Sequence, residues 1–356
     1  EIYTEKKNRY DCDTYFPIID KNKFSLTCVE PINSTICKKT NNKVYYRHLI
    51  WTNDEYIESS KYVWRSSEEQ YLSGLKTILE DGIHTSDRTG VGTISKFGMR
   101  FEYDLEDGFP VLTTKRIFIR AIFEELMLYL RGQTNNKILQ SNGINIWNGN
   151  TSREFLDKRN LSHYPEGDMG ETYGFNFRHF GGNYENCNTI YSKDNGFDQL
   201  EYVINLIKTD PSSRRILINL WNPNTLHKAA LPSCLCQYQF YVNTKTNKLD
   251  LQIYIRSSDF FLANNWNTCT GAFFVHMICN LEDINLNPGK IIVVTGDTHI
   301  YKNHLEGVKI NLNRQPRPLP KLEIINKYKS IEDFKWDDMN IIGYLPEPNI
   351  KVEMAV

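Results

Sequence analysis

The sequence predicts an α+β fold in which a large, mostly antiparallel sheet packs against long helices. Segments with helical periodicity and segments with strand periodicity follow one another from about residue 61 onward. In one strand segment, 249–257, apolar and polar residues alternate from 249 to 256. This segment is joined to the strand segment before it by the turn-rich "NTKTN" of 243–247, which is typical of an antiparallel hairpin.

Three segments have the pattern of long helices. The first covers 68–82 and is closed by Gly82, since glycine commonly follows the last turn of a helix. The second, 119–132, is strongly apolar and also ends in a glycine. The third, 197–211, stops at Pro211, which cannot continue a helix.

Four further segments are predicted to be strands: 214–222, 235–243, 249–257 and 290–297. In the third of them Leu249, Leu251, Ile253 and Ile255 occupy every second position, so these side chains share one face of the sheet. That face is expected to pack against the helices.

Composition narrows the classes of function. The chain has 356 residues, of which 40% are hydrophobic and 24% charged, and its formal charge of −1 argues against a nucleic-acid partner. No apolar run approaches the roughly 18 residues that a membrane span needs, and the first residues do not resemble a signal peptide. The eight cysteines form no CxxC pair and no metal-like spacing, so we expect a reduced, cytoplasmic protein without a metal.

The first 60 residues differ from the rest of the chain. Residues 11–27 read as a turn and a short strand, whereas 29–56 are polar and have no helical period. We therefore divide the chain into a small N-terminal segment, 1–30, a linker, 31–60, and one large domain, 61–356.

The hairpin predicts a neighbour for Cys234. If its turn is centred near Lys245, facing residues have numbers that sum to about 490, which places Cys234 across from Arg256. A guanidinium close to a thiol favours the thiolate. Cys234 is therefore either a reactive nucleophile or one more buried thiol, because unpaired cysteines are commonly buried.

Glu125 is the second unusual residue. On the helix of 119–132, Arg120, Glu124 and Arg131 share one narrow strip, and Glu125 lies outside it among apolar residues. A carboxylate in such surroundings has a raised pKa and suits proton transfer. The alternative is a core glutamate that pairs with a structural arginine.

Several arginines stand at the ends of predicted elements. Arg88, Arg214, Arg215 and Arg256 each have the planar fork that suits a phosphate, although a solvated surface arginine is the ordinary alternative. Arg214 and Arg215 are adjacent on a strand and point to opposite faces, so they cannot serve one local pocket without a bend or a second subunit. His299 and Tyr301 share a face if extended, which suits contacts to a sugar or a satisfied loop histidine.

Taken together, these segments resemble thymidylate synthase from about residue 68 to the C-terminus. The matching motifs follow one another in the order of that family: "DRTGVGT", "FPVLTTKR", "EELMLYLRG", "IWNGNTSREFLD", "YGFNFRHFG", "SSRRILINLWNP", "LPSCLCQYQFYV", "RSSDFFLANNWN", "GDTHIYKNH", "RPLPKL" and "MAV". The stretch "DCDTYFPIID" of 11–20 is similar to the last strands of dihydrofolate reductase. The resemblance thus implies the synthase part of a bifunctional reductase–synthase, in which 1–30 is the end of the reductase domain.

The resemblance also implies an activity and roles for individual residues. The reaction is the reductive methylation of dUMP to dTMP, in which methylenetetrahydrofolate is the cosubstrate, dihydrofolate is released and no metal takes part. The implied catalytic residues are Cys234 as the nucleophile, Glu125, Tyr173, Arg256, Asp259 and Asn267. The implied dUMP-binding residues are Arg88, Arg214, Arg215, Arg256, Ser257, Ser258, Asp259, Asn267, His299 and Tyr301. The implied folate-binding residues are Lys115, Ile146, Trp147, Asn150, Asp259, Leu262, Trp266 and Ala355.

The resemblance also implies a homodimer, because members of the family dimerise through their sheet. Arg214 and Arg215 match the pair that each subunit gives to its neighbour.

Some positions depart from the family pattern. Leu235 replaces a histidine, Ser233 a proline and Ile255 a glutamine, while Ala263–Asn267 replaces a loop of pattern Gly-x-Pro-Phe-Asn. Phe177 and the C-terminal "IGYLPEP" also differ.

Two other readings are compatible with this resemblance. A dCMP or dUMP hydroxymethylase shares the fold and the nucleophile, but the cytosine-specific branch has aspartate where this chain has Asn267, whose amide suits uracil. A weakly active relative or pseudoenzyme that binds a nucleotide or RNA is suggested by Leu235 and by the altered stretch Ala263–Asn267.

Overall fold

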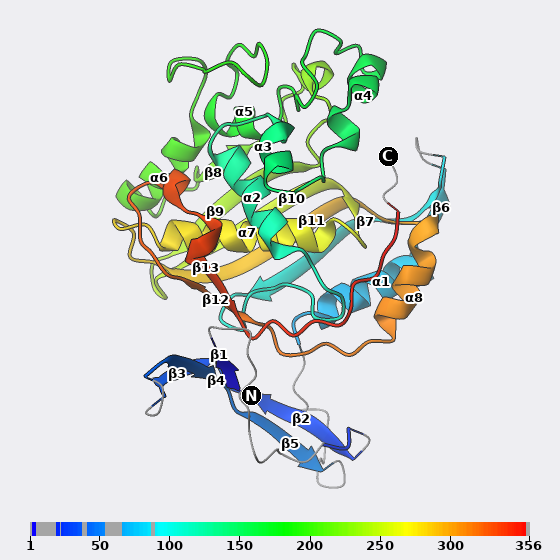
Figure 1. The fold of residues 1–356 in the computed structure, drawn as a ribbon, viewed down its shortest axis with the longest axis vertical. Helices are drawn as coiled ribbons and strands as arrows, with labels where there is room; N and C mark the ends of the chain where they lie inside the picture. Colours follow the sequence, from blue (N-terminus) through cyan, green and yellow to red (C-terminus); the bar gives the residue numbers. More distant parts are fainter. Residues whose placement is uncertain are drawn as a thin grey trace.

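The computed structural model describes residues 2–4, 19–21, 23–37, 41–53, 66–86 and 90–353. Figure 1 shows the N-terminal strands gathered at the lower end of the molecule, below a larger part that is built around one central sheet. The reacting residues implied by the sequence that fall within the described ranges all belong to this larger part.

The central sheet has the strand order β6-β7-β11-β10-β9-β8 within the described residues. Neighbouring strands are antiparallel except β10 and β11, which run parallel. The sheet is therefore mixed, and the parallel pair places the ends of β10 and β11 side by side. Its strands are β6 (Ile83–Thr85), β7 (Thr93–Asp104), β8 (Leu217–Asn219), β9 (Leu235–Asn243), β10 (Lys248–Asp259) and β11 (Asn287–Tyr301).

The three expected helices are present, as α1 (Glu69–Asp81), α2 (Ile119–Leu130) and α6 (Gln199–Thr209). The hairpin of β9 and β10 also lies where the sequence predicts it. Strand β8 is shorter than the predicted 214–222, and β11 is longer than 290–297. The other helices and strands of this part are α3 (Asn136–Ser141), α4 (Arg153–Lys158), α5 (Tyr173–Arg178), α8 (Leu305–Leu312), β12 (Lys321–Ile324) and β13 (Met339–Ile342).

Helix α7 (Asn264–Cys279) is absent from the sequence prediction, although it lies at the centre of the molecule between the sheet and α2 (Figure 1). Most of its residues are buried, so its apolar residues surround the helix and leave no amphipathic stripe to recognise. The prediction of a loop at Ala263–Asn267 is wrong, because Ala263 is the N-cap of α7 and the residues after it form the first turn of that helix.

A buried carboxylate ties α1 to the chain that leads into α2. Glu68 precedes α1 and accepts hydrogen bonds from the backbone amides of Thr113 and Thr114, at 2.8 and 2.9 Å, and from their hydroxyls, at 2.6 and 2.5 Å. Its side chain is almost completely buried. Burial raises the pKa of Glu68, and the four hydrogen bonds oppose that effect.

The segment 31–60, predicted to be a linker, contains strands within the described residues. Strand β4 (Lys43–Tyr46) pairs with β1 (Ile2–Thr4) and β3 (Asn33–Ile36), and β5 (Leu49–Asn53) pairs with β2 (Phe24–Val29). The period-2 pattern of these short strands is hidden by their many polar and half-buried residues.

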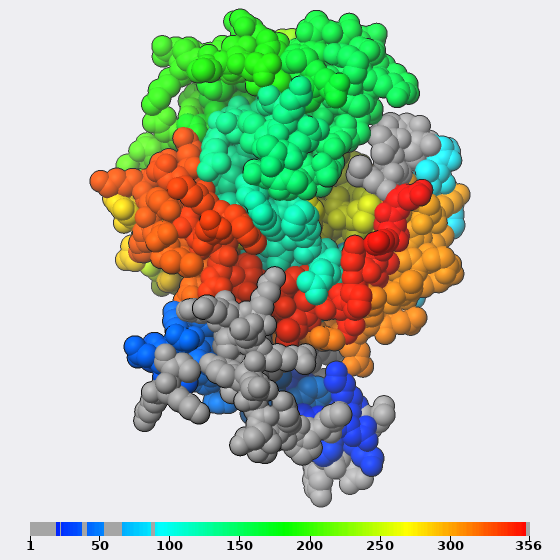
Figure 2. All heavy atoms as spheres, viewed as in Figure 1, coloured from blue at the N-terminus to red at the C-terminus, as the bar shows by residue number. Residues whose placement is uncertain are grey.

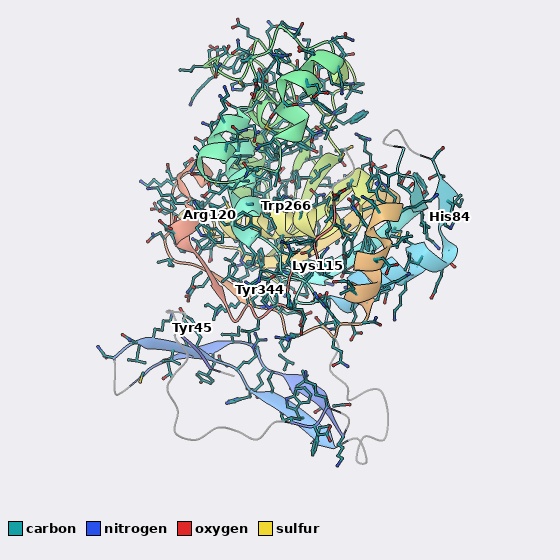
Figure 3. The ribbon with its side chains drawn as sticks, turned by 45° about the vertical axis from the view of Figure 1, so that its right-hand side comes forward. Tyr45, His84, Lys115, Arg120, Trp266 and Tyr344 are labelled. Atoms are coloured by element: carbon teal, nitrogen blue, oxygen red, sulfur yellow. The ribbon has the colours of Figure 1, made fainter. Side chains whose placement is uncertain are left out.

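The N-terminal strands are docked on the larger part through polar contacts. The buried Arg47 donates from Nη2 to the carbonyl of Leu319 at 2.9 Å. Glu323 on β12 accepts a hydrogen bond from Lys43 at 3.0 Å and another from the hydroxyl of Tyr45, whose position is labelled in Figure 3. Tyr45 also packs with Ile32 and Ile342 in a small apolar cluster.

Candidate active site

Cys234 lies just before β9 and faces Arg256 on β10, as the hairpin predicts. The amide of Arg256 donates to the carbonyl of Cys234 at 2.9 Å, and Arg256 Nη2 lies 3.9 Å from Cys234 Sγ. Along most of the hairpin facing residues sum to 491, and a register shift beside Ile255 brings the sum to 490. The predicted register is thus confirmed to within one residue.

Arg256 is held in place by the loop that carries the cysteine. Its Nε donates to the carbonyl of Ser233 at 2.9 Å, and its Nη2 donates to that of Pro232 at 3.1 Å. The guanidinium also stacks over the ring of Trp221, 5.0 Å from the ring centre. The positive charge is therefore fixed beside the sulfur atom, and Arg256 as a residue is half-buried.

The neighbouring cysteine has a different environment. Cys236 is buried, and burial raises its pKa. Burial also raises the pKa of Cys279 to about 12, and the pKa of Cys269 is raised for the same reason. Cys234 is half-exposed and has a guanidinium beside it, so among the described cysteines it has the surroundings of a nucleophile.

Tyr173 connects the cysteine loop to the helices. Its hydroxyl accepts hydrogen bonds from the amides of Cys234, at 2.8 Å, and Leu235, at 3.4 Å. Tyr173 begins α5, and the next residue, Gly174, packs so closely on Gln133 that a Cβ atom would lie 2.0 Å from its carbonyl oxygen. Because no larger residue fits at position 174, α5 can approach the end of α2 and place Tyr173 against Cys234.

Glu125 accepts three hydrogen bonds at the centre of the molecule. Its Oε1 accepts from the indole of Trp147, at 2.7 Å, and from the hydroxyl of Tyr129, at 2.9 Å. Its Oε2 accepts from the indole of Trp266 at 2.7 Å. Burial raises the pKa of Glu125, and the three hydrogen bonds offset part of that effect. Among the described residues its partners are these three side chains and not the structural arginine of the alternative reading.

Aromatic contacts join Glu125 to the cysteine. Tyr129 stacks on Tyr173, with their ring centres 4.9 Å apart, and the ring of Trp147 meets Tyr173 edge-on at 6.2 Å. Glu125 and Cys234, which are far apart in the sequence, thus border one site. Figure 2 shows a hollow on this face, bounded by the cyan and green helices and the red C-terminal segment.

Asp259 stands at the end of β10. Its Oδ1 accepts from the amides of Phe261 and Leu262, both at 3.1 Å, and lies 3.7 Å from Nδ1 of His304. His304 Nε2 lies 2.8 Å from the carbonyl oxygen of Glu353 in the C-terminal segment. Burial disfavours the charged form of His304, but the Asp259 carboxylate and the Glu353 carbonyl together outweigh burial, so the pKa of His304 is raised.

His299 and Tyr301 lie on one face of β11, as predicted, and their rings meet edge-on with centres 5.0 Å apart. Asp259 and His299 are direct neighbours on the parallel strands β10 and β11. Asn267 is half-buried in the first turn of α7, and its backbone N–H donates to the carbonyl of Ala263 at 3.1 Å. The ends of β10 and β11 and the start of α7 therefore converge on one edge of the sheet.

Two predicted ligand-binding side chains point into the protein instead. Lys115 is 4% exposed, donates to the carbonyl of Phe261 and lies over the Phe261 ring at 3.8 Å, and burial lowers its pKa to about 7. Its ammonium is thus not presented to a charged folate tail in this structure. Ser258 is 1% exposed, and its hydroxyl has no hydrogen-bond partner among the described residues.

The remaining predicted residues are less constrained. Arg214 and Arg215 are exposed, and neither guanidinium has a hydrogen bond to another described residue. Asn150 is buried, whereas Ile146, Leu262 and Ser257 are half-buried. Arg88 and Ala355 lie outside the described residues.

The described residues contain no group of side chains suited to hold a metal ion. In the same ranges no helix combines the length and the apolar character that crossing a membrane requires.

Comparison with known proteins supports one family. The family model for thymidylate synthase matches residues 69–356. The human thymidylate synthase is 47% identical over 289 residues, which cover 81% of this chain and 91% of the human protein. The chain belongs to the thymidylate synthase family. This is the methyltransferase family that the sequence resemblance implies, and the hydroxymethylase and pseudoenzyme readings are not favoured.

Bifunctional relatives match nearly the whole chain. The bifunctional dihydrofolate reductase-thymidylate synthase of Paramecium tetraurelia is 41% identical over 97% of this chain and 72% of its own length. The protein of the same name from Zea mays is 36% identical over 99% of this chain and 71% of its own length. The resemblance to the synthase part of such a protein is therefore confirmed.

Two of the departures from the thymidylate synthase pattern lie opposite each other. Leu235 and Ile255 are direct partners across β9 and β10, and both are buried in the main core. The family pattern has polar residues at both positions, so an apolar pair replaces a polar one. At a third departure, Ser233 places its hydroxyl 3.2 Å from that of Thr172.

Some residues of the site are not found from the sequence. Tyr129 lies one helical turn after Glu125, so its spacing could have suggested the hydrogen bond between them. Trp221 and His304 reach the site from separate elements, and no local pattern indicates their contacts with Arg256 and Asp259. These two contacts depend on tertiary structure alone.

Proposed function

We propose that this chain methylates dUMP to dTMP and that Cys234 forms the covalent bond to the substrate. The observation that carries the proposal is the position of Arg256, whose guanidinium is fixed 3.9 Å from the sulfur of Cys234. A positive charge at this distance favours the thiolate, which is the nucleophilic form of cysteine.

The covalent step provides what the reaction needs. The thiolate adds to carbon 6 of uracil, its electron pair forms the C–S bond, and the electrons of the 5,6 double bond move to the carbonyl oxygen at carbon 4 as an enolate. Carbon 5 is then nucleophilic. Carbon 5 then bonds to the one-carbon unit and loses its own proton to a base, which is the hydrogen released as tritium from labelled dUMP. After the one-carbon unit has received the hydride, the C–S bond breaks, its electrons return to the sulfur and the 5,6 double bond re-forms, so dTMP and the thiolate are regenerated.

The neighbouring side chains have the chemistry to hold the nucleotide. Asn267 can both donate to and accept from the edge of uracil. His299 and Tyr301 share a face on which a ribose hydroxyl can bind, and Arg256 also serves the phosphate together with Ser257. The same role is proposed for Arg88 from the family resemblance alone. Glu125 and Tyr173 hold or move protons at the pyrimidine ring.

The residues present also fit a bound folate. Methylenetetrahydrofolate supplies the one-carbon unit and the hydride when it is bound. Asp259 uses Oδ1 for two backbone amides, so Oδ2 remains to accept from a folate N–H. Leu262 donates its backbone amide to Asp259, and the indole of the largely buried Trp147 donates to Glu125, so we propose that both residues border the folate together with Asn150.

The decisive assay follows tritium released from carbon 5 of labelled dUMP in the presence of methylenetetrahydrofolate. We expect release together with formation of dTMP, whereas labelled dCMP should release none. A folded protein that binds dUMP but releases no tritium would contradict the proposed activity, and a hydroxymethylated product in place of dTMP would support the alternative enzyme.

The proposal includes a homodimer formed through the open face of the sheet. Gln239, Tyr241, Gln252 and Tyr254 share that face on β9 and β10, and Tyr241 is 63% exposed. Arg214 and Arg215 are exposed and unpaired within the described residues, so they are available to a phosphate in the other subunit.

Two inactive variants should restore activity when their subunits mix. In a dimer of a Cys234→Ser chain and an Arg214→Ala/Arg215→Ala chain, one site has both the cysteine and the donated arginines. With random mixing we expect about a quarter of the wild-type activity, since half of the dimers are mixed and each has one complete site. Mixed dimers isolated with two different affinity tags that remain inactive would contradict arginine donation.

We further propose that residues 1–30 are the end of a reductase domain and that 61–356 are the synthase domain. The match of bifunctional relatives to almost the whole chain supports this division. The boundary proposed at 31–60 has to accommodate β3, β4 and β5, so this segment connects the two domains with strands of its own.

A further inference from the structure

Glu125 distributes its three hydrogen bonds unequally between its two oxygens. Oε1 accepts from Trp147 and Tyr129, whereas among the described residues Oε2 accepts from Trp266 alone. The Trp266 contact is as short as the Trp147 contact, at 2.7 Å. If the Trp266 donor is removed, one oxygen of a largely buried carboxylate loses its partner.

Trp266 reaches Glu125 from a different element. Glu125 is on α2, and Trp266 is in the first turn of α7, directly before Asn267. Figure 3 labels Trp266 near the middle of the molecule, on α7. The hydrogen bond therefore connects the helix that carries the proton-handling carboxylate to the turn that carries the uracil-reading amide.

We propose that Trp266 is a positioning residue, which holds Glu125 in its ionised form and fixes the direction of its Oε2. This inference deepens the proposed function and rests on it for the role of Glu125. It differs from the folate contact that the sequence resemblance implies for Trp266, because here the indole N–H acts on the protein's own carboxylate. The ring of Trp266 remains half-buried beside the site.

The expected effect follows from the charge of the acceptor. A hydrogen bond to an ionised carboxylate is stronger than one to the neutral acid, so the Trp266 indole lowers the pKa of Glu125 against the effect of burial. Removing the donor raises that pKa. As the solution is made more acidic, activity that needs ionised Glu125 then begins to fall at a higher pH than in the wild type. At pH values well above the pKa of Glu125, activity is unchanged.

The test is the substitution Trp266→Phe, which removes the N–H and retains an aromatic ring. We expect the acidic limb of the kcat/KM profile to move up by about one pH unit, and kcat at low pH to fall accordingly, while dUMP binding at high pH is retained. Trp336→Phe is the matched control. Trp336 packs on Phe123 of the same helix α2 from η7 (Trp336–Asp338) and makes no hydrogen bond to Glu125, so the limb should not move.

An increased KM for the folate with an unchanged acidic limb would overturn the proposal and leave Trp266 as a folate contact. A second measurement does not depend on turnover. In protein labelled with ¹⁵N at its tryptophans, the indole N–H signal that Trp266→Phe removes should shift with pH as Glu125 titrates. A signal that does not respond to pH would also overturn the proposal, whereas a responding signal in a protein without turnover would contradict only the proposed activity.

Discussion

The substitution Cys234→Ser is expected to reduce tritium release from dUMP by about 10³-fold or more. Serine has nearly the same size, but its hydroxyl ionises far less readily than a thiol, so Arg256 at 3.9 Å cannot make it a comparable nucleophile. The amide of residue 234 can still donate to Tyr173 and the loop carbonyls can still hold Arg256. Binding of dUMP should therefore change by only a few-fold.

Cys236→Ser is the matched control because Cys236 lies only two positions from Cys234, within β9, whereas Cys234 lies just before that strand. Cys236 is buried, and its raised pKa keeps it a thiol, so its loss should leave turnover within a few-fold of wild type. If Cys236→Ser abolished tritium release while Cys234→Ser retained it, the nucleophile would have been assigned to the wrong thiol.

Replacement of Glu68 by alanine is expected to lower the free energy of unfolding by about 3–5 kcal/mol. Two amides and two hydroxyls, from Thr113 and Thr114, would lose their acceptor in a buried place. The measurement is the shift in the urea midpoint at an unchanged slope.

Two variants separate the hydrogen bonds of Glu68 from general effects on α1. Glu68→Gln keeps one acceptor oxygen but turns an amide donor toward the threonines, so its loss of stability should lie between that of Glu68→Ala and zero. Glu80→Ala removes an exposed carboxylate near the end of the same helix and should change stability by no more than about 0.5 kcal/mol. Equal midpoints for Glu68→Ala and Glu80→Ala would show that the buried contacts contribute nothing.

The part of the site that can be predicted depends on short-range geometry. A hairpin fixes its own register, so counting outward from the turn is enough to place Arg256 opposite Cys234. The helical wheel likewise separates Glu125 from the charged strip of α2, and three donors surround it in the folded protein. Both inferences use only residues that are close in the sequence.

The features that escape prediction lie beyond such local rules. Helix α7 is buried on nearly all sides and has no stripe, and the family pattern suggests a loop where its first turn lies. Trp266 and Trp147 meet at Glu125 from elements that are more than a hundred positions apart, so no local pattern reveals their role as donors. The charge of Lys115 suggests an exposed side chain, whereas the Phe261 carbonyl and two aromatic rings hold it in the interior.

The direct pairing of Leu235 with Ile255 has a consequence for how this site could have diverged from its relatives. If an ancestor had histidine and glutamine there, exchanging either one alone would have left the other buried opposite an aliphatic side chain, at a cost of about 1–3 kcal/mol. The effects of the two positions on stability are therefore expected to be coupled: restoring both polar residues together should cost less than the sum of the costs of restoring each of them alone.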